Sequence, residues 1–253
     1  MREKRLEKIL NYLKEKGFVT INELKESLNV SEATVRRDLN FLKQHGLIEK
    51  YRGGASLKGY PRELSFFVRL DEFKNEKKRI AEKTVTLLEN HQIIALGGGS
   101  TIYYTICALD DSSLHDLTII TNSITTAWAV IQLKKSFKLI HTGGTVREGS
   151  FECIGGHVLS FLEKMNFDVF ITGADGIHPI VGVTFTDIEE AFVARKTLER
   201  SKRVIVVADH RKIGKIAPIK MCDMNEVSYL ITDDLSNEIS LSLKKRGVNV
   251  ILA

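Results

Sequence analysis

The N-terminal quarter of the chain contains the run SEATVRRDLNFLKQ, which occupies residues 31–44. Val35, Leu39 and Leu42 recur every three to four residues, so the run predicts a helix with one buried face. Ser31 is a residue type that caps the first turn of a helix. The opposite face then carries small, hydroxyl, amide and basic side chains: Ala33, Thr34, Arg36, Arg37 and Asn40.

A second helix is predicted directly before this one. Residues 20–23 read Thr-Ile-Asn-Glu, and a threonine followed three residues later by glutamate is a capping box, which starts a helix over residues 21–28. Residues 29–30 make a tight break, and an amphipathic helix over residues 2–16 precedes the pair. Two short helices joined by a tight turn, the second exposing paired arginines, predict a helix-turn-helix that reads the major groove of DNA.

The residues after this helix, LIEKYRGGASL at 47–57, predict a β-hairpin wing. Arginine can donate two hydrogen bonds to guanine, whereas serine and threonine bind phosphates. We therefore expect double-stranded DNA as a partner, contacted by Thr20, Ser31, Ala33, Thr34, Arg36, Arg37, Asn40, Lys50 and Arg52. A three-helix protein-interaction module with solvated arginines is the alternative interpretation.

The positive charge of the chain is confined to the same segment. Residues 1–60 hold 13 Lys or Arg and 8 Asp or Glu, an excess of five that equals the net charge of the whole chain, +5. A polyanion partner for this segment follows from that distribution. No apolar run approaches the ~18 residues that span a bilayer, and the charged N-terminus lacks the apolar core of a signal peptide. We therefore expect no membrane partner and a cytoplasmic protein, associated with the nucleoid through DNA.

The three cysteines, Cys107, Cys153 and Cys222, form no CxxC pair and have no zinc spacing. Buried free thiols in a reducing compartment are the expectation. We expect neither a cofactor nor a metal ion.

Residues 58–75 predict a linker that becomes partly ordered, because its three phenylalanines are too apolar for a free tether. From residue 76 onward, helices and strands alternate, which predicts an α/β sandwich around a mostly parallel sheet. The expected strands cover residues 92–96, 117–121, 138–141, 168–172, 204–208, 229–232 and 249–252, and the expected helices cover residues 77–88, 102–109, 125–133, 156–165, 188–200 and 237–245.

The loops after these strands suit a small anionic ligand, because ligands of such sheets bind at the carboxyl ends of the strands. Glycines let backbone N–H groups approach an anion, arginine and lysine bind phosphate, and aspartate accepts hydrogen bonds from sugar hydroxyls. The expected ligand residues are Gly97, Gly98, Gly99, Ser100, Thr101, Asn122, Ser123, Gly143, Gly144, Arg147, Asp175, Glu189 and Lys212. Two of these loops have a purely structural alternative. Residues 97–101 also fit a tight turn, and the acidic pair at residues 189–190 also complements a helix dipole.

Two groups of motifs in this sequence resemble the DeoR family of bacterial regulators. The first is residues 31–39 with Leu42, Gly46 and residues 52–55; the second is residues 119–123, Gly143-Gly144 with Arg147, residues 168–177, 182–184, 189–193 and 208–214, and Thr232-Asp233. The resemblance implies a winged helix-turn-helix at residues 1–57, a linker at residues 58–75, and an effector and oligomerisation domain at residues 76–253 that is similar to ribose-5-phosphate isomerase. It further implies a homo-oligomeric repressor, dimer or tetramer, of a carbohydrate-utilisation operon, released by a phosphorylated sugar or a related metabolite.

Two residues carry separate expectations. The family usually has aspartate at the position of Gly97, so a carboxylate that reads hydroxyls is expected to be missing here. Asp38 lies beside the arginine pair on the recognition helix, and we expect it to orient an arginine by a charge-assisted bond rather than to touch DNA.

Two other functions stay open from the sequence. In an active sugar-phosphate isomerase, Glu189 or Glu190 would act as the base and Lys212 would stabilise the enediolate. Alternatively, the second segment serves oligomerisation alone. We expect a regulator and no enzyme.

Overall fold

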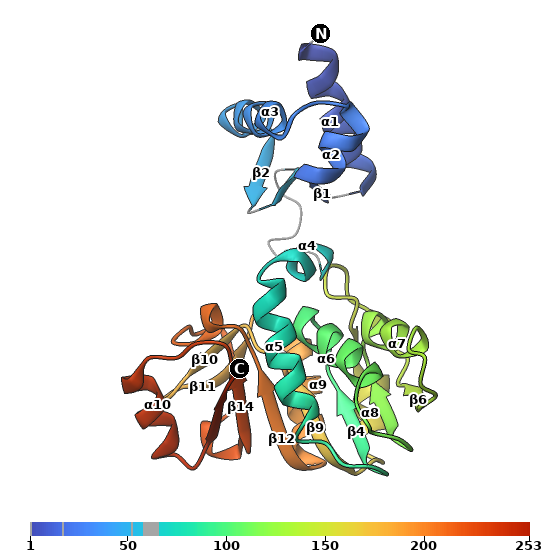
Figure 1. Cartoon of the computed structure of the whole chain (residues 1–253), viewed down its shortest axis with the longest axis vertical. Coiled ribbons are helices and arrows are strands. Elements are labelled where there is room, and N and C mark those ends of the chain that lie inside the picture. The colour runs from blue at the N-terminus through green and yellow to red at the C-terminus, as the bar shows by residue number, and fades with distance from the viewer. Residues whose placement is uncertain (1, 17, 52, 58–65) are drawn as a thin grey trace. The chain divides into compact units, whose positions relative to one another are not determined.

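The computed structural model of the chain describes residues 2–16, 18–51, 53–57 and 66–253. These residues divide into two compact units, Met1–Glu72 and Phe73–Ala253. The elements of the first unit are α1 (Arg2–Lys16), β1 (Phe18–Thr20), α2 (Ile21–Leu28), α3 (Glu32–Gln44), β2 (Ile48–Tyr51), β3 (Gly54–Leu57) and α4 (Phe66–Asp71), as Figure 1 shows.

The first unit folds as the capping residues and apolar spacing predict. Thr20 and Glu23 form the predicted capping box at the start of α2, and Ser31 accepts a hydrogen bond from the backbone of Thr34 at the start of α3. Asn29 between the helices adopts a left-handed conformation, with φ of 50°. Apolar side chains of α1, α2 and α3 share one core with the wing, whose members include Ile9, Leu13, Leu24, Val35, Leu39, Leu42, Ile48 and Ala55.

The wing has one strand more than the predicted hairpin. Strand β1 pairs with β3, and β3 pairs with β2, so the three antiparallel strands have the order β1-β3-β2. β1 is only three residues long, too short to show a periodic pattern, but its Val19 is buried in the core of the unit. Part of the predicted linker, residues 58–65, lies outside the described residues, and α4 follows it.

The second unit is a three-layer α/β structure around a seven-stranded sheet (Figure 1). Its helices are α5 (Lys74–Val85), α6 (Ser100–Asp110), α7 (Ile124–Ile131), α8 (Gly156–Leu162), α9 (Ile188–Glu199) and α10 (Asn237–Lys244), with short 3-10 turns η1 (His210–Lys212) and η2 (Met224–Glu226). The large sheet contains β4 (Ile93–Leu96), β5 (Thr118–Thr121), β6 (Lys138–His141), β9 (Phe167–Thr172), β12 (Ser201–Val207), β14 (Tyr229–Thr232) and β15 (Asn249–Leu252).

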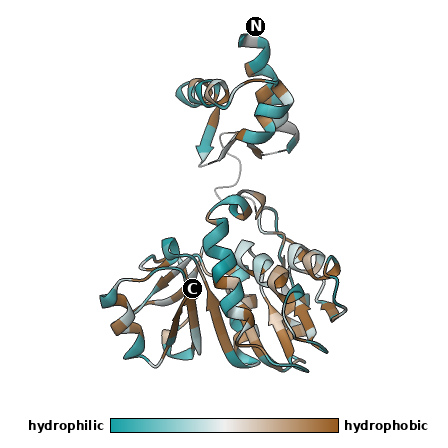
Figure 2. Cartoon of the chain, viewed as in Figure 1, coloured by the Kyte–Doolittle hydropathy of each residue, from teal (hydrophilic) through white to brown (hydrophobic). Residues whose placement is uncertain are grey.

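All adjacent strands of the large sheet are parallel, in the order β15-β14-β12-β9-β4-β5-β6. Alternate strand residues face opposite layers, as the pleat requires. Ile94, Ile119 and Ile171 pack with α5, α6 and α7, whereas Ala95 and Ile120 pack with α8, α9 and α10 on the other face. The strands are accordingly brown in Figure 2, while the outward side of α5 is teal. The predicted mostly parallel α/β fold is confirmed.

Two antiparallel additions were not predicted. One is the sheet β10-β11-β13, formed by β10 (Gly176–His178), β11 (Gly182–Phe185) and β13 (Ile219–Cys222); the other is the hairpin of β7 (Thr145–Val146) and β8 (Cys153–Ile154). These strands have two to four residues, which is too few for a recognisable alternation. A Cβ atom at Gly182, where φ is 105°, would lie 2.0 Å from the Cys222 carbonyl oxygen, so this close strand approach requires glycine.

The cysteines are free, but the expectation that all three are buried is wrong. Cys153 and Cys222 are buried, whereas Cys107 on α6 is exposed because it lies on the outer face of that helix. Burial raises the pKa of Cys222 to about 12, which keeps its thiol protonated. Within the described residues, no helix combines the length and the apolar character needed to cross a membrane.

Candidate functional site

The outer face of α3 presents the side chains that the sequence assigns to DNA. Ala33, Arg36, Arg37 and Asn40 are exposed, while the apolar residues of the opposite face are buried. The side chain of Thr34 is half-buried, because its hydroxyl bonds to Ser31 Oγ at 2.9 Å. The helix therefore offers a polar, basic surface whose backbone is anchored by the core beneath it.

The two arginines differ in their surroundings. Arg36 is held by Glu32, one turn earlier, with 2.6 Å between Arg36 Nη2 and Glu32 Oε1. Arg37 pairs with no other residue in the described part of the chain. Its guanidinium is therefore available to a partner without breaking an existing ion pair.

The wing brings a third cation to this face. Lys50 on β2 donates a hydrogen bond to Asn40 Oδ1 on α3. Burial lowers the pKa of Lys50, and the nearby charges of Arg36 and Lys43 lower it further. These three cations repel one another, so neutralisation by phosphates would relieve the repulsion. Arg52, the other wing residue assigned to DNA, lies outside the described residues.

The serine and threonine hydroxyls on this unit act first as helix caps. Thr20 Oγ1 accepts from the backbone N–H of Glu23 at 3.1 Å and donates to the Glu23 carboxylate at 2.9 Å. Ser31 Oγ accepts from the backbone N–H of Thr34 at 3.3 Å. Their structural role is fixed by these contacts, and their role toward DNA stays a prediction.

Asp38 bonds to arginines, but not to the pair on its own helix. It is 1% exposed, on the buried side of α3, and accepts from Arg5 Nη2 at 3.2 Å and from Arg2 Nε at 3.3 Å. The hydrogen bonds that Arg5 donates to Asp38 raise the pKa of Arg5. Helical spacing explains this orientation of Asp38. It follows the buried Val35 by three residues and therefore points toward α1. Asp38 fixes α3 to α1 and lies on the side of α3 opposite the residues predicted to contact DNA.

In the second unit, the order of the strands reverses between β4 and β9. The chain runs outward from β4 through β5 and β6, then returns to β9 on the other side of β4. The carboxyl ends of β4 and β9 are the switch point where ligands of such sheets bind. The backbone N–H of Gly97 donates to Ile171 O at 3.0 Å, so the two loops start side by side.

The glycine loop at residues 97–99 has a carboxylate packed against it. A Cβ at Gly98 would lie 2.6 Å from the Cγ, Cδ and Oε1 atoms of Glu152. Gly99 has φ of 101° and leaves the first turn of α6 without a side-chain cap. Gly97 itself offers no carboxylate, but a carboxylate from another segment lies against the loop. Glu152 supplies one from the β7–β8 hairpin.

Asn122 and Ser123 hold this hairpin in place. Asn122 Nδ2 donates to Cys153 O at 2.9 Å and to Glu152 Oε2 at 3.4 Å. Ser123 Oγ caps α7 by accepting from the backbone N–H of Thr126, and Thr126 Oγ1 donates to Gly97 O at 3.1 Å. The second predicted loop thus positions the first loop and Glu152.

Arg147 is paired with the start of α9. Its Nε lies 3.0 Å from Asp187 Oδ2, and its Nη1 lies 3.1 Å from Glu190 Oε1. Glu190 is therefore the member of the acidic pair that faces Arg147, while the predicted Glu189 is half-buried beside it. Gly144 nearby serves packing, because a Cβ there would lie 2.5 Å from Val158 Cγ2.

The remaining predicted pair, Asp175 and Lys212, closes the cluster. Lys212 Nζ on η1 lies 3.3 Å from Asp175 Oδ1, and Asp175 Oδ2 accepts from the backbone N–H of Thr186 at 2.9 Å. Thr186 immediately precedes Asp187, the partner of Arg147, and Arg147 shares the β7–β8 hairpin with Glu152. We call this set the loop ring; its charged members are Arg147, Glu152, Asp175, Asp187, Glu190 and Lys212. Carboxylates outnumber cations in it.

Comparison with known proteins identifies both units. A family model described as the DeoR-like helix-turn-helix domain matches residues 5–58, and one described as the DeoR C terminal sensor domain matches residues 72–234. The chain belongs to the DeoR family. It is a DNA-binding transcriptional regulator with a sensor domain.

Relatives of this DeoR-family chain match over most of their length. The HTH-type transcriptional repressor GlcR of Bacillus subtilis is 31% identical over 99% of this chain and 96% of its own. The glycerol-3-phosphate regulon repressor of Escherichia coli is 32% identical, covering 89% of this chain and 88% of its own. Among solved structures, ribose 5 phosphate isomerase A of Neisseria gonorrhoeae matches with a TM-score of 0.41 at 20% identity, covering 54% of this chain and 52% of its own.

Two members of the loop ring of this DeoR-family regulator were not predicted from the sequence. Glu152 precedes the two-residue strand β8, and no periodic pattern marks its side chain as facing the glycine loop. Asp187 was recognisable only as a residue before a helix, and it does accept from the backbone N–H groups of Glu189 and Glu190 at 3.0 Å each. Its position before a helix did not reveal its second role as a partner of Arg147.

Proposed function

We propose that this regulator represses a carbohydrate-utilisation operon and is released from its operator by a small phosphorylated sugar or a related metabolite. One observation carries the proposal. The chain joins a basic recognition face on α3 to a ring of polar loops at the switch point of a parallel sheet. The first feature reads DNA, and the second suits a small polar ligand.

The charges of the loop ring suggest how the ligand divides between its groups. Glu152 and Asp175 accept hydrogen bonds from sugar hydroxyls, since both carboxylates lie at the carboxyl ends of the central strands or against them. Lys212 and the backbone N–H groups at the start of α6 bind the phosphate. Lys212 must leave Asp175 to do so, which frees Asp175 for a hydroxyl.

The ring supports binding without turnover. An isomerase would pair Glu189 or Glu190 with Lys212 as base and enediolate-stabilising cation. Here Glu190 is bound to Arg147, and Lys212 is bound to Asp175, so the cation and the acidic pair belong to different contacts. The relatives are likewise named as transcriptional regulators.

Contacts within the second unit connect Lys212 to the end of the predicted linker, so ligand binding could be transmitted to the linker. Lys212 lies on η1 together with Arg211 and His210. The guanidinium carbon of Arg211 lies 3.8 Å from the ring centroid of Phe73, and the His210 ring lies 5.4 Å from it. Phe73 is the first residue of this unit and precedes α5. A shift of Lys212 toward phosphate would move η1 and thereby the point where the linker ends.

We further propose that the regulator acts as a homo-oligomer in the cytoplasm. Palindromic operators are read by symmetric dimers, and α7 offers an apolar surface for such contact. Ile124, Trp128 and Ile131 lie on one side of α7 and are 41%, 60% and 62% exposed.

A paired experiment tests the proposal. Fluorescence anisotropy with DNA from the region upstream of the gene that encodes this chain should show a specific, salt-sensitive complex. One or more sugar phosphates should weaken that complex. Lys212→Ala should keep the DNA affinity but lose the ligand response and the thermal stabilisation by the same sugar phosphate. Absence of a specific DNA complex would refute the proposal that the chain represses transcription from this DNA. A specific complex that no sugar phosphate weakens would refute only the proposed ligand class.

A further inference from the structure

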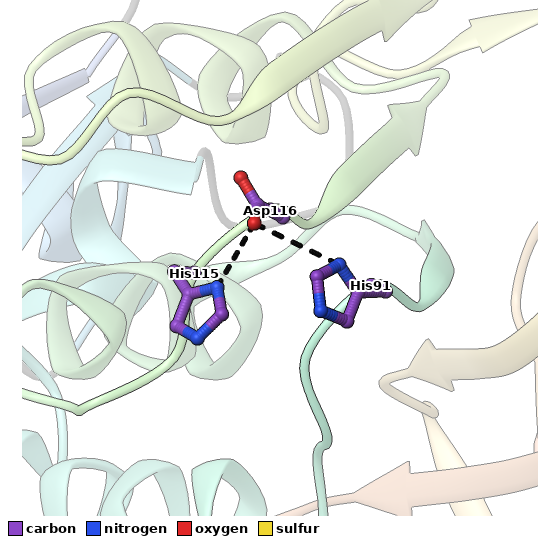
Figure 3. A group of neighbouring side chains, drawn as sticks. All are labelled: His91, His115 and Asp116. Carbon is purple, nitrogen blue, oxygen red and sulfur yellow. Dashed lines mark hydrogen bonds and ion pairs between the residues drawn. The ribbon is translucent and has the colours of Figure 1, made fainter.

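A cluster of two histidines and one aspartate lies at the edge of the large sheet opposite the loop ring. His91 precedes β4, and His115 and Asp116 precede β5, so the cluster lies at the amino ends of two neighbouring parallel strands. Figure 3 shows both imidazole rings converging on the carboxylate of Asp116. All three side chains are exposed. Neither the DNA-facing side of α3 nor the loop ring uses them.

The geometry points to a divalent transition-metal site, which we propose binds Zn²⁺. His115 Nδ1 lies 3.0 Å and His91 Nδ1 lies 3.7 Å from the same oxygen, Asp116 Oδ2. Tetrahedral zinc bound to nitrogen and oxygen at ~2.0–2.2 Å separates its ligand atoms by about 3.3–3.5 Å. The two measured distances lie on either side of that value. Two imidazoles and a carboxylate form a donor set that zinc accepts, with water completing the shell at this exposed position.

The two loops are held in place before any metal binds. Asn90 Oδ1 accepts from the backbone N–H of His115 at 3.0 Å, and Gln92 O accepts from that of Thr118 at 3.0 Å. His91 and Asp116 adopt left-handed conformations, with φ of 64° and 56°, which directs their side chains toward the cluster. Metal binding therefore costs little ordering of the backbone.

Asn90 determines which ring nitrogen of His115 carries the hydrogen when no metal is bound. Asn90 Nδ2 lies 2.7 Å from His115 Nε2 and donates to it, so His115 Nδ1 carries the proton and donates to Asp116. When zinc binds His115 Nδ1, the ring proton must move to Nε2. The Nε2–H group then needs a hydrogen-bond acceptor, whereas the Asn90 amide N–H group is a donor. A carboxylate at position 90 would accept from both the backbone N–H and Nε2–H of His115. Asn90→Asp should therefore tighten zinc binding.

The test uses Zn²⁺ alone with the untagged full chain carrying Cys107→Ser, because the exposed Cys107 thiol is itself a zinc ligand. Titration calorimetry should give one Zn²⁺ per chain, and Zn²⁺ should raise the melting temperature. His91→Asn, which suits the left-handed backbone, and His115→Ala should each weaken binding about tenfold or more. His45→Ala removes an exposed histidine of the first unit and should leave zinc affinity and stoichiometry unchanged.

The outcomes separate cleanly. Weaker binding in both histidine variants together with tighter binding in Asn90→Asp supports the site. Absence of zinc binding, or affinity and stoichiometry unchanged by His91→Asn and His115→Ala, overturns it. Because the substituted residues other than His45 lie in the second unit, the far-UV circular dichroism spectrum and the melting temperature without Zn²⁺ serve as the folding controls for every variant.

Discussion

Arg37 and Arg36 share a helix face but differ in what they must give up to bind DNA. Arg37 has no described partner, whereas Arg36 must leave Glu32. We expect Arg37→Ala to weaken specific operator binding by about 1–3 kcal/mol, the value of a good arginine–guanine contact. The loss should be smaller for Arg36→Ala. Anisotropy titrations on operator and scrambled DNA measure both, with Lys164→Ala on the second unit as the charge-matched control.

Asp38 is a buried residue that we expect to affect DNA binding only through the stability of the first unit. Its carboxylate is buried and accepts hydrogen bonds from Arg5 and Arg2. Asp38→Ala should lower the free energy of unfolding of the first unit by about 1–3 kcal/mol, because charged hydrogen bonds are lost in a buried place. Urea unfolding followed by circular dichroism measures this. An unchanged midpoint would show that the α1–α3 contact contributes nothing.

We expect Glu152 to influence ligand preference, because its carboxylate packs against the glycine loop. Glu152→Gln keeps its size but removes the charge, and we expect it to weaken binding of a hydroxyl-rich effector by about 1–3 kcal/mol. Gly98→Ala should act similarly, because its Cβ occupies the space of the Glu152 side chain. Thermal shift with the effector that releases the wild type measures both variants, and operator affinity without effector should stay unchanged. Equal effector affinity in the wild type and Glu152→Gln would remove Glu152 from the ligand site.

At the scale of elements, η1 connects Lys212 of the loop ring to Phe73 at the start of α5. Phe73→Ala removes the ring that Arg211 and His210 contact. We expect this variant to bind effector and operator as the wild type does, but to release DNA less completely when effector is added. The reason is that effector binding would no longer be coupled to DNA release. Anisotropy of the DNA complex over an effector titration measures the coupling. Full release by Phe73→Ala would exclude this route.

The same scale explains what the sequence could predict. Helices such as α3 and α9 and buried strands such as β14 are long or apolar enough to show a period, and their bounds agree with the prediction to within a residue. Strands β7, β8 and β10 are too short to show a period, and Glu152 and Asp175 immediately precede β8 and β10. Loop glycines and Lys212 were visible by type, but partners such as Arg147–Asp187 depend on tertiary contacts that no local pattern encodes.

For the whole molecule, the single tryptophan offers a test of the proposed assembly through α7. Trp128 is 60% exposed in one chain, on the apolar side of α7. If α7 forms the subunit contact, tryptophan emission should shift to shorter wavelength and resist iodide quenching as protein concentration rises. Trp128→Glu should then yield a smaller species in sedimentation experiments, because a charge is costly in an apolar contact. An oligomer that persists unchanged in Trp128→Glu would assign the interface elsewhere.

The Glu152–Gly98 contact has a consequence for how such sensors diversify. The carboxylate near the glycine turn comes from a separate hairpin rather than from the turn itself. We therefore expect substitutions at position 152 to alter effector preference while the turn keeps its own sequence. On this expectation, a change of inducer requires no change in the sequence of the glycine turn.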